Sequence, residues 1–120
     1  MSQKILITED EKPIAKALKL KLEKEGYLVT VAENGRAALD FLKKDQFDLL
    51  ILDLLMPELD GFAILNEIKN MKLNVHIIVA SNLGQEEDLK RATKLGAETY
   101  FVKSNTSLAQ IVEQVKKVLL

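Results

Sequence analysis

Five polar side chains come at the ends of short apolar runs, and their chemical types suit the handling of phosphate. They are two carboxylates at Glu9 and Asp10, a third at Asp53, the Ser81 hydroxyl and the Lys103 ammonium. Clustered carboxylates repel one another unless a cation joins them, and an all-oxygen ligand set suits magnesium, which favours phosphate partners. With such an ion present, Asp53 could attack a phosphoryl group while the hydroxyl and ammonium neutralise its oxygens. Phosphoryl transfer is therefore the chemistry these residue types indicate.

Taken singly, each of these residues also has an ordinary structural explanation. Glu9 and Asp10 could be acids at the start of a helix, and Asp53 could cap a strand or helix. Ser81 could be a loop or capping serine, and Lys103 a solvated surface lysine. The chemical interpretation therefore depends on whether the fold brings the five residues together.

The apolar pattern predicts five buried strands that alternate with five amphipathic helices. The strands are expected at residues 4–8, 27–32, 47–52, 75–80 and 98–102. The first helix has Pro13 in its first turn and ends at Gly26, and the others are expected at residues 36–44, 62–71, 86–95 and 108–119. Such alternation predicts an α/β fold with one doubly wound parallel sheet. Because parallel strands end at the same edge, the five polar residues should meet there.

Composition limits the classes of protein that fit. The chain has 120 residues, enough for one domain spanning 1–120, and its 48% hydrophobic and 29% charged residues are typical of a globular protein. A net charge of −1 gives no general attraction to nucleic acid or to an anionic membrane surface. No apolar stretch approaches the roughly 20 residues needed to span a bilayer. We therefore expect a cytoplasmic protein without direct nucleic-acid or membrane binding.

Two motifs resemble those of a known family. They are Asp53-Leu-Leu-Met-Pro-Glu-Leu-Asp-Gly and Gly96-Ala-Glu-Thr-Tyr-Phe-Val-Lys103. Together with Glu9, Asp10 and Ser81, they resemble the receiver (CheY-like) domain of two-component response regulators over essentially the whole chain. The resemblance implies a flavodoxin-like (βα)5 fold with five strands in the order 2-1-3-4-5.

The resemblance also implies a role for each residue of the acidic cluster. Asp53 would accept the phosphoryl group from the phosphohistidine of a sensor histidine kinase or a phosphotransfer protein. Asp10 and Asp53, with the backbone carbonyl of Leu55, would bind Mg2+, and Glu9 would reach it through water. The domain would catalyse only its own phosphorylation and dephosphorylation.

The remaining motif residues would form a switch. Ser81 would follow the phosphoryl group, Lys103 corresponds to the invariant lysine, and Tyr100 corresponds to the switch aromatic, although half-buried packing is an equally good explanation of Tyr100. The switch would change the surface of the fourth helix, fifth strand and fifth helix. That surface would face a downstream protein, an output domain, or a second copy in a phosphorylation-dependent homodimer.

Several positions depart from the family pattern. Ser104 replaces a cis-forming proline, and a cis bond before serine costs about 3 kcal/mol, so we expect a trans peptide with a reshaped loop or a strained cis bond. Asn82 replaces a small residue and could crowd the space into which the aromatic turns. Leu55 and Leu83 are apolar and cannot orient a water for hydrolysis, which predicts slow autodephosphorylation.

Three rival interpretations fit the sequence less well. A haloacid-dehalogenase-type phosphatase needs a second aspartate where this chain has Leu55, and also a larger cap. A flavodoxin-like cofactor binder needs a phosphate-cradling loop, where Glu9-Asp10-Glu11 would instead repel phosphate. A pseudo-receiver that serves only for binding or dimerisation would not need all of Asp10, Asp53, Ser81 and Lys103.

Overall fold

The computed structural model describes residues 2–120 and consists of strands and helices in strict alternation. In chain order the elements are β1 (Lys4–Thr8), α1 (Lys12–Lys24), β2 (Leu28–Ala32), α2 (Gly35–Lys44), β3 (Leu49–Leu52), α3 (Gly61–Met71), β4 (His76–Ser81), α4 (Glu86–Lys94), β5 (Thr99–Val102), a 3-10 turn η1 (Lys103–Asn105) and α5 (Leu108–Val118). The ends predicted by residue number lie within two residues of these bounds. The turn η1 was not predicted.

The five strands form one parallel sheet in the order β2-β1-β3-β4-β5, which confirms the predicted fold class and strand order. The central strand β3 is buried along its whole length, as expected of a strand covered on both faces. In the register of the sheet, Thr8 pairs with Leu52, and Ser81 pairs with Val102. The chain therefore leaves β1, β3, β4 and β5 at the same edge of the sheet.

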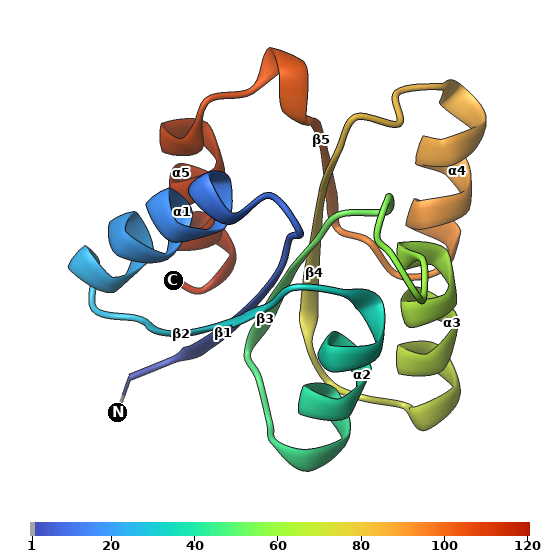
Figure 1. Cartoon of the computed structure of the whole chain (residues 1–120), viewed down its shortest axis with the longest axis horizontal. Coiled ribbons are helices and arrows are strands. Elements are labelled where there is room, and N and C mark those ends of the chain that lie inside the picture. Colours follow the sequence, from blue (N-terminus) through green and yellow to red (C-terminus); the bar gives the residue numbers. More distant parts are fainter. Residues whose placement is uncertain (1) are drawn as a thin grey trace.

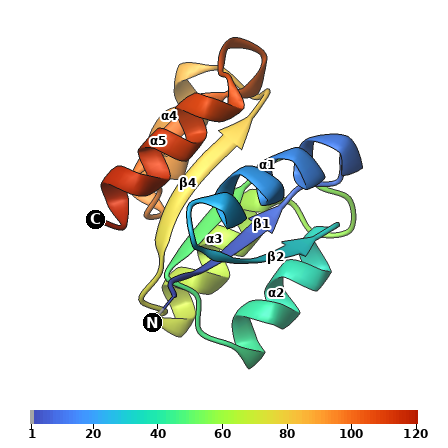
Figure 2. The same cartoon turned by 90° about the vertical axis from the view of Figure 1, so that its left-hand side faces the viewer.

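Helices cover both faces of the sheet and enclose two apolar clusters. Figure 1 and Figure 2 show α1 and α5 on one face and α2, α3 and α4 on the other. The cluster under α1 and α5 includes Leu18, Ile51 and Ile111, and the cluster on the opposite face includes Leu50, Ile64 and Ala92. Successive residues of β3 thus point to opposite clusters, because strand side chains alternate between faces.

Local sequence signals set the ends of several helices. Pro13 lies in the first turn of α1, where its missing N–H costs no hydrogen bond. The Asp60 carboxylate accepts a hydrogen bond from the Ala63 N–H at 2.9 Å and so caps α3. Gly26 and Gly96 follow α1 and α4 with positive φ, the backbone region that glycine favours after a helix.

Within residues 2–120, no helix combines the length and apolarity needed to cross a bilayer.

Candidate functional site

The ends of β1 and β3 are tied together, and this fixes the acidic residues that follow them. The Asp53 N–H donates to the Thr8 carbonyl at 3.3 Å, and the Thr8 hydroxyl donates to the Ile51 carbonyl at 2.9 Å. The Glu9 N–H donates to the Ala32 carbonyl at the end of β2, at 3.0 Å. These hydrogen bonds hold the backbone at Glu9 and Asp53, and so they set where the two carboxylate side chains begin.

Three carboxylates meet at this edge. One oxygen from each of Glu9, Asp10 and Asp53 lies within 4.8 Å of the others. Glu9 and Asp53 are buried, with 6% and 5% of their surface exposed, whereas Asp10 is exposed. The predicted convergence of these residues from two separate segments is thus present in the structure.

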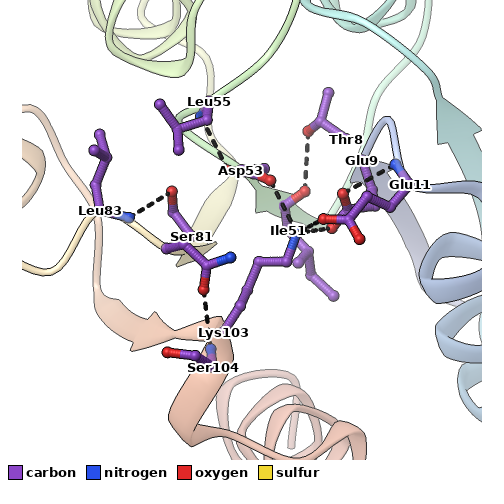
Figure 3. Close-up of polar contacts among 11 residues, drawn as sticks. Thr8, Glu9, Glu11, Ile51, Asp53, Leu55, Ser81, Leu83, Lys103 and Ser104 are labelled. Carbon is purple, nitrogen blue, oxygen red and sulfur yellow. Dashed lines mark hydrogen bonds and ion pairs between the residues drawn. The ribbon is translucent and has the colours of Figure 1, made fainter.

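Lys103 joins the carboxylates (Figure 3). Its Nζ donates to Glu9 Oε1 at 2.7 Å, to Asp53 Oδ2 at 3.0 Å and to Glu11 Oε1 at 3.4 Å, and its side chain is only 10% exposed. Burial by itself would lower the pKa of Lys103, but the hydrogen bonds to Glu9 and Asp53 outweigh burial and raise that pKa. Lys103 is therefore a fixed, permanently charged group beside Asp53.

The environment of Glu9 disfavours its charged form, and the pKa of Glu9 is raised as a result. Burial raises the pKa of Glu9, while hydrogen bonds from Lys103 and from the Glu11 N–H, which lies 3.2 Å from Glu9 Oε2, oppose the increase without cancelling it. The carboxylates of Glu9, Glu11 and Asp53 share the Lys103 ammonium, and the Asp10 carboxylate lies beside those of Glu9 and Asp53. The cluster has an excess of negative charge that a second cation would reduce.

The donor set fits magnesium. Carboxylate and carbonyl oxygens are the ligands that this hard ion prefers, and the three carboxylate oxygens lie close enough for one ion to approach all of them. Leu55 follows Asp53 by two residues, and its N–H donates to Asp53 Oδ1 at 3.0 Å. That bond folds the backbone around the carboxylate and brings residue 55 to the rim of the cluster.

Ser81 and Tyr100 both hydrogen-bond to the backbone of Leu83, Ser81 to its N–H and Tyr100 to its carbonyl. The Ser81 hydroxyl, fully buried at the end of β4, accepts a hydrogen bond from the Leu83 N–H at 3.4 Å (Figure 3). The Tyr100 hydroxyl donates to the Leu83 carbonyl. Burial raises the pKa of Tyr100 to about 12, with the charges of Asp88 and Asp53 adding to the effect.

Ser81 and Tyr100 therefore lie beside the acidic cluster without joining it. Within the described residues, neither side chain is hydrogen-bonded to Asp53. Tyr100 is half-buried, which agrees with the expectation of partial packing.

The peptide bond between Lys103 and Ser104 is trans, since residues 2–120 contain no cis peptide. Of the two expected outcomes, the structure therefore has the reshaped loop, in which Lys103–Asn105 form the turn η1. The Ser104 N–H donates to Asn82 Oδ1 at 3.0 Å. Asn82 thus reaches toward the turn that follows Lys103.

Sequence reasoning missed two features of the site. The ion pair between Glu11 and Lys103 was not predicted, although Glu11 follows β1 two residues after Glu9 and shares its sign of charge. The hydrogen bond between Asn82 and Ser104 was also missed. It could have been suspected from the sequence, because Asn82 and Ser104 both depart from the family pattern and follow β4 and β5, which are neighbours in the sheet.

Comparison with known proteins gives a consistent picture. A model of the family described as "Response regulator receiver domain" matches residues 5–116. The chemotaxis protein CheY of Halobacterium salinarum is 36% identical over 103 residues, covering 86% of each chain. The sporulation initiation phosphotransferase F of Bacillus subtilis is 36% identical over 119 residues, covering 99% of this chain and 95% of that protein. The receiver domain of the Francisella response regulator 1452 is 30% identical with a TM-score of 0.90, covering 98% of this chain and 96% of that structure.

Proposed function

The chain belongs to the response regulator receiver domain family, a family of signalling domains rather than conventional enzymes, and from this we propose that Asp53 is its phosphoacceptor. The observation that carries the proposal is the position of Lys103 Nζ, which lies 3.0 Å from Asp53 Oδ2 inside a cluster of three carboxylates. An ammonium at that place can neutralise charge on a phosphoryl group as it arrives at the carboxylate.

The proposed reaction is the transfer of a phosphoryl group from a phosphohistidine. An oxygen of Asp53 attacks phosphorus, the P–N bond breaks, and the imidazole nitrogen keeps the electron pair. The product is an acyl phosphate on Asp53, which water can later attack at phosphorus to restore the carboxylate and release inorganic phosphate. The donor would be a sensor histidine kinase or a phosphotransfer protein.

Magnesium would be held by the carboxylates of Asp10 and Asp53 and the backbone carbonyl of Leu55, with Glu9 acting through water. When bound, the ion supplies positive charge that neutralises the carboxylates and the phosphoryl oxygens. Lys103 orients the Asp53 carboxylate by binding Oδ2, and the Leu55 N–H holds Oδ1.

The phosphorylated site would act on the rest of the domain through Ser81 and Tyr100. A new dianion attracts the Ser81 hydroxyl away from the Leu83 N–H, which frees the loop between β4 and α4 to move. Tyr100 then exchanges its bond to the Leu83 carbonyl for an inward position. The result is a population shift of the surface formed by α4, β5 and α5, which a downstream protein or output domain would bind.

The test is intact-mass analysis after incubation with acetyl phosphate and magnesium. The parent should gain one base-labile phosphoryl group in a magnesium-dependent manner, and Asp53→Asn should gain none. Asp45→Asn is the matched control, because Asp45 is an exposed carboxylate that pairs with Lys4 away from the acidic cluster. Failure of the parent to form an adduct, with or without magnesium, would reject the phosphoacceptor role in favour of a pseudo-receiver that binds partners in its unmodified form.

A further inference from the structure

A hydrogen bond joins the loop after β4 to the turn after β5, between two residues that both depart from the family pattern. The Ser104 N–H donates to Asn82 Oδ1 at 3.0 Å. Ser81 and Val102 are the last paired residues of the two strands in the register of the sheet. The bond therefore extends the pairing of β4 with β5 beyond the ends of the two strands. It reaches the residue that directly follows Lys103.

The two residues are chemically matched. The Ser104 amide lies in the first part of η1, where backbone N–H groups have no partner within the turn, and an asparagine carbonyl is a favoured cap for such groups. A proline at position 104 would have no N–H to donate. An alanine or glycine at position 82 would have no side-chain oxygen to accept the bond. The bond therefore needs both the asparagine at position 82 and a residue with a backbone N–H at position 104.

The turn that this bond holds carries Lys103. Thr106 holds the turn from within, because its hydroxyl donates to the Val102 carbonyl at 2.8 Å and its N–H donates to the Lys103 carbonyl at 3.3 Å. Asn82 holds the turn from the neighbouring loop. A lysine side chain is a flexible four-carbon stem, so the place of its ammonium depends on where the backbone anchors it.

We propose that Asn82 is a positioning residue for Lys103: its hydrogen bond to the Ser104 amide sets the turn from which the ammonium reaches Asp53 and Glu9. The proposal rests on the proposed function, in which that ammonium neutralises the incoming phosphoryl group. A proline ring at position 104 would itself restrict the backbone of this turn. Ser104 imposes no such restriction, and the bond from Asn82 restrains the turn instead.

The size of the effect follows from the exposure of the bond. Asn82 and Ser104 are both exposed, so water can take over the amide when the asparagine oxygen is removed. The ammonium should then sample a wider range of positions without leaving the site, because Glu9 and Asp53 still bind it. Since a full 1 Å misplacement can cost about 100-fold in rate, we expect Asn82→Ala to slow phosphorylation by about threefold to tenfold.

The first measurement is made on the unphosphorylated protein. The 13Cε and 1Hε signals of Lys103 are assigned by NMR from their loss in Lys103→Met, and are then compared between the parent and Asn82→Ala. They should move toward the values of a free lysine in Asn82→Ala. The matched control is Asn105→Ala, an exposed amide in the same turn, which should leave them in place. Unchanged Lys103 signals in Asn82→Ala would overturn the proposal.

The second measurement is the rate of adduct formation with acetyl phosphate at fixed magnesium. A threefold to tenfold loss in Asn82→Ala, with the parent rate kept in Asn105→Ala, would support the proposal. A parent-like rate in Asn82→Ala would overturn it even if the NMR signals moved. If the parent takes up no phosphoryl group, the proposed function fails, and the NMR comparison alone then decides whether Asn82 positions Lys103.

Discussion

Replacing Lys103 by methionine should make the protein markedly less stable and make its stability depend on magnesium. The methionine keeps most of the length and apolar character of the stem but removes the ammonium. In the parent that ammonium is 2.7 Å from Glu9 and 3.0 Å from Asp53, and all three side chains are at least nine-tenths buried. Without it, the carboxylates that share this edge repel one another with no compensating charge.

The expected loss can be worked from the geometry. Removing one partner of a buried ion pair typically costs about 3–5 kcal/mol, and because this cluster opens to solvent at Asp10 we take about 3 kcal/mol. For a domain of this size, about 4 °C of Tm corresponds to each kcal/mol, so Tm should fall by about 12 °C at pH 7 without magnesium. Magnesium at 100 times its Kd adds about 2.7 kcal/mol and should restore most of the loss.

Lowering the pH, like adding magnesium, should reduce the stability deficit of Lys103→Met. Burial already raises the pKa of Glu9 above its ordinary value of 4.5 in the parent, and loss of Lys103 removes the main opposing contact. A carboxyl whose pKa is higher in the folded state takes up protons on folding, so the folded protein loses stability as pH rises from 4.5 through the folded-state pKa. The deficit of Lys103→Met relative to the parent should therefore shrink as pH is lowered from 7 toward 4.5.

The assay is thermal unfolding of the parent and Lys103→Met, with and without magnesium, across this pH range. Lys90→Met is the matched control, because Lys90 pairs with Glu86 on the exposed face of α4, where the same change should move Tm by no more than about 2 °C. A loss of Tm in Lys103→Met as small as in Lys90→Met would refute the reasoning. So would a magnesium response no larger than that of the parent at the same magnesium concentration.

Three further predictions concern the surroundings of the site. Leu55→Asn combined with Leu83→Glu should shorten the lifetime of the phosphorylated form, measured by the decay of the adduct mass, because polar side chains can orient a hydrolytic water; an unchanged decay would contradict this. Gly35→Ala should lower Tm by about 12 °C, a loss of about 3 kcal/mol, since its Cβ would lie 1.7 Å from the Leu59 carbonyl oxygen; a parent-like Tm would show that the loop gives way. Tyr100→Phe should remove a phenol that ionises near pH 12 from the ultraviolet titration, and the parent should lose stability relative to it between pH 10 and 12, because only the unfolded chain ionises there; equal stability curves would argue against the raised pKa.

Patterns in the amino-acid sequence were enough to place the helices and strands and to identify the residues that meet at the carboxyl-end edge of the sheet. Apolar runs and their turn residues are local signals, so β3 and α3 could be placed within two residues. Once five strand–helix units were recognised, the rule that parallel strands end at one edge brought Glu9, Asp53 and Lys103 together without coordinates. The strand order came from the family resemblance rather than from periodicity, because a pattern of apolar residues does not say which strands are neighbours.

How the side chains at that edge pair with one another could be learned only from the folded molecule. The bond from the Ser104 N–H to Asn82 joins two segments that lie 22 residues apart in the sequence. The turn η1 and the trans peptide before Ser104 are local, but the sequence left them open. Glu11 also contacts Lys103 because its side chain extends far enough to reach the ammonium. The spacing of residues along the chain does not reveal such a contact. Strand and helix follow from short-range periodicity, whereas hydrogen-bond partners at the edge of a sheet are chosen by distances of a few tenths of an ångström between segments that meet only in the folded molecule.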